Sequence, residues 1–204
     1  ERMSVRKSPP EGLSVRQRLT LFNGSGLNAE QALSTDEEEI TYEFLLQHGV
    51  KALNITCAGI RPLALKRFGV SEAQQLRRLG FDALHLVDPV FCNEANAAYG
   101  AADVINSFLN TPHDAVALAG SEAVATLNLT TEQLLSACAG APTEAITVIE
   151  QSKETTVFRG VTARTILDTG LRAPQLKQLG YSLASVHELS GMGPNELSKL
   201  GFTL

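Results

Sequence analysis

The sequence has no tryptophan, few aromatic residues and no excess of basic charge. Aromatic residues make up 5% of the 204 residues, whereas 44% are apolar and alanine and leucine are plentiful. Aromatic and β-branched residues favour strands, while Ala and Leu favour helices, so this composition argues against a β-sandwich and for packed helices. A net charge of -5 at pH 7 gives no overall positive field for phosphate backbones. Nucleic acid is therefore not the first partner that we expect.

Cysteine pairs and long apolar runs are also missing. Cys57, Cys92 and Cys138 are odd in number, lie far apart and show no CxxC spacing, which argues against a disulfide framework and a zinc knuckle. No run approaches the roughly 18 apolar residues of a membrane-spanning helix. The N-terminus has charges and prolines where a signal peptide would be apolar. We expect a cytoplasmic protein that does not bind membranes.

Motifs of catalysis and ligand binding are absent as well. The chain contains no GxxxxGK[ST], HExxH, GxSxG or GxGxxG pattern and no spaced set of acidic metal ligands. His48, His85, His113 and His187 are potential bases for a cysteine nucleophile, but nothing in the sequence joins a particular pair. We expect no enzyme, no cofactor and no metal. An enzyme with a dispersed site remains an alternative, and it would need a deep pocket with convergent polar groups.

A ten-residue period is the dominant signal in what is present. Glycines occur at 49, 59, 69 and 80 and again at 160, 170, 180, 191 and 201. The segment from 160 onward can be laid over the segment from 49 onward, glycine upon glycine. Such regular spacing predicts a repeat architecture.

Each unit of the repeat has the features of a short helix. Glycine accepts the left-handed backbone that ends a helix, and the apolar residue after it can pack back on that helix. Side-chain oxygens suited to capping the next helix follow at Ser71, Asp82, Thr162, Ser182 and Thr203, and prolines suited to a first turn at Pro62, Pro174 and Pro194. Apolar residues three apart, such as Leu176 and Leu179, define one buried face. We therefore predict an all-α, solenoid-like array of short stacked helices.

The period is weaker elsewhere. In the middle we expect helix ends at Gly100, Asn110, Gly120, Asn128 and Gly140, with breaks in helical structure at residues 87–90 and 147–149. We expect residues 1–34 to be an N-terminal arm with a basic helix at 14–22, and 35–204 to be the repeat domain. Within that domain we expect a capping helix at 35–48 and repeat blocks at 49–84 and 160–204. The last residues, 201–204, resemble the opening of a further unit, so we expect a piece of a longer protein.

The segments LKRFGVS, LRRLGFD, LKQLGYS and LSKLGFT resemble the ten-residue helical repeats of the "AKELREAGFS" type found in some protist and bacterial proteins. The resemblance covers residues 49–84 and 160–204. It implies stacked helices and a role in protein interaction, and it brings no catalytic motif.

A second resemblance concerns the segment 189–197, LSGMGPNEL, which is similar to the hairpin of helix-hairpin-helix DNA-binding modules. That resemblance implies contacts between a DNA phosphate and the amides of Gly191, Met192 and Gly193, assisted by Lys199. Asn195 departs from it, because a basic residue is often found there.

The predicted function is therefore a non-enzymatic scaffold that binds another protein, either alone or within a larger assembly. The best candidates for a partner-binding face are the basic residues Arg61, Lys66, Arg67, Arg77 and Arg78. Ordinary solvated charge opposite an apolar stripe is the alternative interpretation of these residues. A nucleic-acid-binding module is the alternative function.

Overall fold

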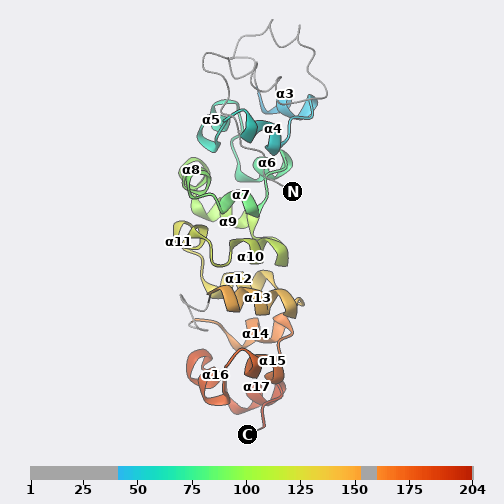
Figure 1. Ribbon diagram of the computed structural model, residues 1–204, viewed down its shortest axis with the longest axis vertical. Helices are drawn as coiled ribbons and strands as arrows, with labels where there is room; N and C mark the ends of the chain where they lie inside the picture. The colour runs from blue at the N-terminus through green and yellow to red at the C-terminus, as the bar shows by residue number, and fades with distance from the viewer. Residues whose placement is uncertain (1–40, 153–159, 204) are drawn as a thin grey trace, which may run out of the picture. The chain divides into compact units, whose positions relative to one another are not determined.

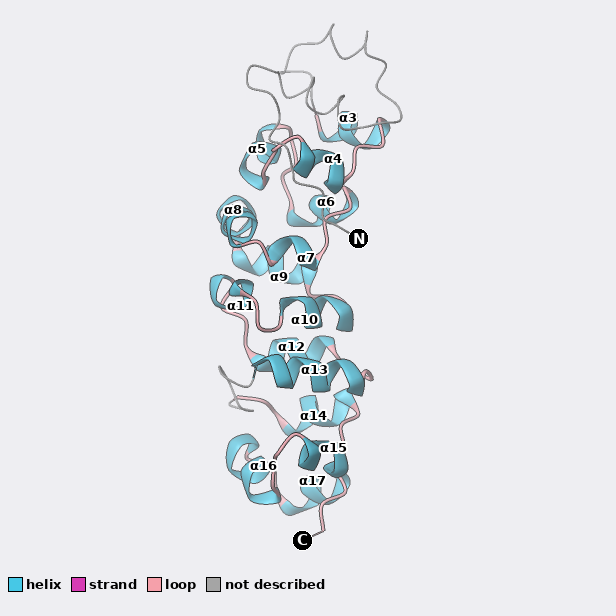
Figure 2. Cartoon of the chain, in the orientation of Figure 1, coloured by secondary structure: helices cyan, strands magenta, loops and turns pink. Residues whose placement is uncertain are grey.

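The structure is a computed structural model that describes residues 41–152 and 160–203. Within these residues the chain forms fifteen helices and no strand, as Figure 2 shows. The predicted all-α fold of short stacked helices is confirmed. The arm at 1–34 and its expected helix at 14–22 lie outside the described residues.

The chain divides into two compact units. Unit 1 comprises the residues up to Asp82 together with Asn93–Ser107, and unit 2 comprises Ala83–Cys92 and Phe108–Leu204. The first helices, which lie in unit 1, are α3 (Tyr42–Gln47), α4 (Ala52–Cys57), α5 (Pro62–Arg67) and α6 (Ala73–Arg78). Both units contribute residues to α8 (Pro89–Tyr99) and α9 (Ala101–Phe108). The remaining helices, which lie in unit 2, are α7 (Ala83–Leu86), α10 (Pro112–Leu118), α11 (Glu122–Thr126), α12 (Thr131–Ala137), α13 (Pro142–Ser152), α14 (Ala163–Thr169), α15 (Ala173–Gln178), α16 (Leu183–Ser190) and α17 (Pro194–Lys199).

The repeat glycines that follow a described helix end it as the sequence predicts. All nine repeat glycines have a positive φ, for example +89° at Gly180, and Gly100, Gly120, Gly140 and Asn128 share this conformation. After six of them the next residue donates its N–H back to a carbonyl of the finished helix, as Tyr181 does to the carbonyl of Leu176 at 2.9 Å; these six are Gly49, Gly59, Gly69, Gly80, Gly180 and Gly201. This bond is the mark of a Schellman ending, and the side chain of Tyr181 is buried with it.

Some local predictions were wrong. Asn110 is not left-handed, and its N–H is accepted by the Asp114 carboxylate at 3.3 Å. Residues 147–149 do not break a helix, because Ala145, Val148 and Ile149 form one buried face of the continuous helix α13. The other predicted break is confirmed at residues 87–88, between the end of α7 at Leu86 and the start of α8 at Pro89, whereas Pro89 and Val90 themselves are helical.

Some of the predicted helix-capping residues are confirmed and one is wrong. Thr162 and Ser182 cap α14 and α16, accepting the N–H of Thr165 and of Ser185. Ser71 does not cap α6, since Glu72 is the residue at that position. The capping helix expected at 35–48 is described only from Thr41 on. There the backbone is extended and the helix begins at Tyr42.

In unit 1, helices wind so that one begins beside the end of the helix two places further along, as the starts of α3 and α4 show. In unit 1, Ala52 at the start of α4 donates its N–H to the carbonyl of Leu79 at the end of α6, at 2.7 Å. An ideal Cβ on Gly69, after α5, would lie 3.9 Å from the N of Tyr42 at the start of α3. Three helices therefore complete one turn of the winding within this unit.

Helices three places apart consequently stack on one another. In unit 1, α5 lies beside α8 (Figure 1), and Tyr99 of α8 donates its hydroxyl to the carbonyl of Pro62 at 3.2 Å. In unit 2, α10 packs against both α7 and α13, while α12 packs against α10, α13 and α14. Short helices gain their stability from these neighbours, because two turns do not persist alone in water.

The structure also reveals an internal duplication. Ala173 donates to the carbonyl of Leu200 at 2.7 Å, and these residues lie 121 positions after Ala52 and Leu79, which make the same bond at the same distance. Thr41 and Thr162, also 121 apart, both accept an N–H at the start of their helices at 3.2 Å. We call residues 41–81 (α3–α6) the first block and residues 162–202 (α14–α17) the second block.

The duplication corrects the alignment inferred from the glycines. That alignment placed Gly49 upon Gly160, whereas the shared hydrogen bonds place Gly49 upon Gly170, one repeat further on. The buried residues agree with the new register. Equivalent core pairs are Leu45 and Ile166, Val50 and Leu171, Ile55 and Leu176, Leu65 and Val186, Leu76 and Leu197, Leu79 and Leu200, and Phe81 and Phe202.

Candidate interaction surface

The five basic candidates do not form one free face. Arg61 places Nη1 3.2 Å from Glu94 Oε1 of α8, although 58% of its side chain stays exposed. Lys66 donates from Nζ to the carbonyl of Ala98, near the C-terminal end of the same helix. A cation is favourable there because the last carbonyls of a helix carry partial negative charge. Arg61 and Lys66 thus help to hold α8 against α5.

The other three basic candidates lie in the last turns of their helices. Arg67 is exposed at the end of α5, and Arg78 is exposed at the end of α6, beside the half-buried Arg77. Basic residues at these places complement the helix dipole, which accounts for them without a partner. The basic candidates therefore have mixed roles, structural for some and accessible to a partner for others.

The helix-hairpin-helix-like segment has its amides occupied. The N–H of Gly191 is accepted by the carbonyl of His187 at 2.9 Å, that of Met192 by Ser190 Oγ at 3.3 Å, and that of Gly193 by Glu196 Oε2 at 2.9 Å. A phosphate would have to displace these acceptors and approach the Glu196 carboxylate. Lys199 is exposed at the other end of α17.

The first block explains why the segment has this form. Glu72, which is equivalent to Gly193, likewise has its N–H accepted by a side chain three residues on, Gln75 Oε1 at 3.2 Å. The hairpin is thus the ordinary junction of this repeat, in which the third helical residue caps the start of its own helix.

Sequence reasoning missed a set of exposed leucines in the first block. Leu53 is 71% exposed, Leu63 is 47% exposed and Leu46 is 40% exposed. Leu53 and Leu63 are the second residues of α4 and α5, ten positions apart and outside the three-apart stripe that forms the core. Leu53 and Leu63 occupy the same position in successive repeats, and this periodicity could have identified them from the sequence. Residues outside the apolar stripe were instead expected to be charged.

The second block shows that the fold does not need Leu53 and Leu63. The residues 121 positions after Leu53 and Leu63 are Pro174 and Ala184, and both are exposed. The second block forms the corresponding four helices and the same hydrogen bond between the α4- and α6-like helices, from Ala173 to Leu200, although it has no large apolar group at positions 174 and 184. Leu53 and Leu63 are therefore features of the surface of the first block, not of its packing.

Basic residues accompany both leucines. Lys51 precedes α4 by one residue and Leu53 by two, and Arg61 has the same relation to α5 and Leu63. Both basic side chains are exposed. We call Lys51, Leu53, Arg61 and Leu63 the α4–α5 surface.

A polar pocket of about 340 Å³ lies elsewhere in unit 1, between the start of α6 and α9. It is lined by Ser71, Glu72, Ala73, Gln74, Asp103, Asn106 and Ser107. Two carboxylates among neutral polar groups suit a cationic group, and the lining contains no His, Cys or Lys. Within the part of the chain that the structure describes, no three His, Cys, Asp or Glu residues gather as metal ligands.

The buried thiols have little nucleophilic character. Burial, with a smaller contribution from the Glu144 carboxylate, raises the pKa of Cys138 to about 11. Burial also raises the pKa of Cys92, against the weaker opposing effect of a hydrogen bond with Thr126. The thiolate is the nucleophilic form, so both groups stay neutral and unreactive near pH 7.

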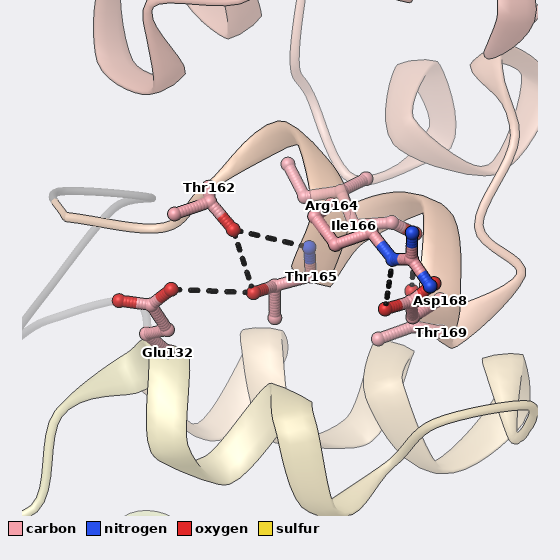
Figure 3. A network of polar contacts seen from close by, with 7 residues as sticks. All are labelled: Glu132, Thr162, Arg164, Thr165, Ile166, Asp168 and Thr169. Carbon is pink, nitrogen blue, oxygen red and sulfur yellow. Dashed lines mark hydrogen bonds and ion pairs between the residues drawn. The ribbon is translucent and has the colours of Figure 1, made fainter.

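The polar network in Figure 3 joins α14 to α12 within unit 2. Thr162 Oγ1 lies 2.9 Å from Thr165 Oγ1, which in turn donates to Glu132 Oε1 at 3.3 Å. Further along the same helix, Arg164 and Asp168 form an exposed ion pair at 2.8 Å. These contacts connect a helix cap to the neighbouring helix, which is a structural role.

The fold defines an all-helical repeat protein of short stacked helices. No protein-family model matches the chain, and no curated protein and no solved structure is significantly similar to it. Among the described residues, no helix has both the length and the apolar character needed to cross a membrane.

Proposed function

We propose that the chain is a non-enzymatic scaffold that binds another protein through the first block. The observation that supports this function is the exposure of Leu53 and Leu63 at positions where the equivalent second block has Pro174 and Ala184. Burying a leucine side chain fully is worth about 1.5 to 3 kcal/mol. Two such groups that the fold leaves in water can supply binding energy to a partner.

Nucleic acid is the less favoured partner. The amides of Gly191, Met192 and Gly193 already have acceptors, and one of these acceptors is a carboxylate. The Nζ of Lys66 is already bonded to the carbonyl of Ala98. Neither arrangement offers a ready site for a phosphate backbone.

The test is a pull-down from native cell extract, with and without nuclease, followed by mass spectrometry. The bait is the full chain, compared with a double variant, Leu53→Ser with Leu63→Ser. The matched control is Pro174→Ser with Ala184→Ser, which changes the equivalent positions of the second block. Circular dichroism checks that all three baits are folded.

We expect a protein that survives nuclease, is retained by the control and is lost from the leucine variant. Recovery that disappears with nuclease would favour nucleic acid instead. A partner retained equally by all baits would place the binding surface away from the first block.

A further inference from the structure

The stretch of sequence that contains the exposed leucines carries charged residues of one sign only. Between Glu43 and Glu72 the sequence contains no acidic residue, but it contains four basic ones, Lys51, Arg61, Lys66 and Arg67. The whole chain has a net charge of -5, so this segment is a local reversal of its charge. The corresponding part of the second block is mixed, since Asp168 and Glu188 lie among its basic residues.

The structure presents two consecutive copies of the same arrangement. Lys51 and Leu53 open α4, and Arg61 and Leu63 open α5, so that each helix start carries an exposed cation and an exposed leucine. The stem of Lys51 lies over the end of α6, where an ideal Cβ on Gly80 would be 3.8 Å from Lys51 Cδ. Arg78 is exposed in the last turn of that helix and adds positive charge there.

We propose that the α4–α5 surface binds an acidic, amphipathic protein segment, in which leucine-like side chains at helical spacing are interspersed with Asp and Glu. This inference rests on the proposed function and names the chemistry of its partner. Leu53 and Leu63 receive the apolar side chains, while Lys51 and Arg61 meet the carboxylates. Glu94 already shows that a carboxylate fits beside Arg61, at 3.2 Å.

The second block is the internal control for this assignment. It keeps a basic residue at one helix start, Arg172, but has Pro174 where the first block has Leu53. At the next helix start it has Ser182 in place of Arg61 and Ala184 in place of Leu63. It shares the fold of the first block but not the combination of charge and apolar side chains.

The probe is a short fluorescein-labelled peptide of leucine and glutamate with the leucines at helical spacing. One control peptide has lysine in place of glutamate, and a second has serine in place of leucine. Fluorescence anisotropy measures the binding of each peptide to the full chain at low and at moderate salt. The protein variants are Lys51→Gln with Arg61→Gln, and the charge-matched control Arg172→Gln with Lys177→Gln.

We expect the leucine–glutamate peptide to bind most tightly, with an affinity that falls as salt rises. Removing Lys51 and Arg61 should weaken it about tenfold, while the control pair should change it less than about twofold. Equal binding of the lysine peptide, or no effect of Lys51→Gln with Arg61→Gln, would overturn the inference.

The same variants separate this inference from the proposed function. A cellular partner that is lost with Leu53→Ser and Leu63→Ser but bound fully by Lys51→Gln with Arg61→Gln would sustain the scaffold function and refute an acidic partner. A partner that binds both variants as well as it binds the parent chain would refute both proposals.

Discussion

At the scale of single residues, the end of α15 depends on the conformation of Gly180, and the buried face of this repeat includes Leu179. Gly180 has a φ of +89°, and an ideal Cβ there would meet nothing within 4 Å. A side chain would fit in the space around this residue, so only the backbone conformation excludes it. Leu179 is buried directly before it, whereas its neighbour Gln178 is exposed.

Replacing Gly180 with valine should lower the free energy of unfolding by about 1 to 3 kcal/mol, because a β-branched residue is strained at positive φ. Urea denaturation followed by circular dichroism measures the change. Gly193→Ser is the control, since Gly193 has a φ of -75° and serine is a good residue at a helix start. Equal losses in the two variants would show that backbone strain is not the cause.

Leu179→Ala should cost about 2 to 5 kcal/mol of stability, because it removes buried apolar contacts and leaves a cavity. Gln178→Ala should change stability by less than about 0.5 kcal/mol, as exposed positions usually do. The same denaturation experiment compares them. Similar midpoints for the two variants would contradict the assignment of buried and exposed faces.

At the scale of helices, a start is capped in one of two ways. Thr41 and Thr162 accept an N–H with their own hydroxyl oxygens. Ala52 and Ala173 instead donate to a carbonyl at the end of another helix, and the preceding N–H groups of Lys51 and Arg172 are accepted by Asn54 and Gln175 at 2.9 Å each. Both solutions satisfy the donors that a helix start leaves open.

Thr162→Ala should destabilise the protein by about 1 kcal/mol for the lost cap. Its effect should exceed that of Thr41→Ala, because Thr162 also contacts Thr165, which holds Glu132 of the neighbouring helix. Thr162→Ser keeps the hydroxyl and should retain most of the stability. Thermal unfolding of the three variants measures the order, and a larger effect of Thr41→Ala would show that the network in Figure 3 adds nothing.

The sequence could predict the helix ends better than the helix starts. A left-handed glycine is a local requirement, so its spacing revealed the repeat. The carbonyl that caps Ala52 comes from Leu79, 27 residues away, and no local pattern discloses it. The error at residues 147–149 arose because a short β-branched run resembles a strand, whereas the buried face of α13 depends on its neighbours α10 and α12.

At the scale of the whole chain, the structure supplied the correct register of the duplication. Ten-residue units are so alike that the sequence fits both an alignment of Gly49 with Gly160 and one with Gly170. Only bonds between distant helices distinguish the two. The same comparison revealed the candidate surface, since Leu53 is seen to be dispensable for the fold only when it is compared with Pro174, the equivalent residue of the second block.

Raising the pH from about 8 to 11 should lower the stability of the chain. Burial raises the pKa of Cys138 to about 11 and that of Tyr99 to about 12, so the unfolded state loses these protons first. Stability therefore falls once the pH passes the ordinary pKa of each group, and continues to fall until it reaches the raised one. Urea midpoints at several pH values measure the slope, which Cys138→Ala should reduce. An unchanged slope would contradict the pKa assigned to this thiol.

The hydrogen bond from the Ala52 N–H to the Leu79 carbonyl has a consequence for the evolution of the surface. Most helices need Ser, Thr, Asp or Asn at their first position, and that need restricts the sequence. Where distant backbone and the third helical side chain satisfy the donors instead, the position can hold lysine or arginine, as it does at 51 and 172. Each such helix start can then acquire a new side chain without loss of the fold, so a chain of these repeats can change its surface while its architecture is conserved.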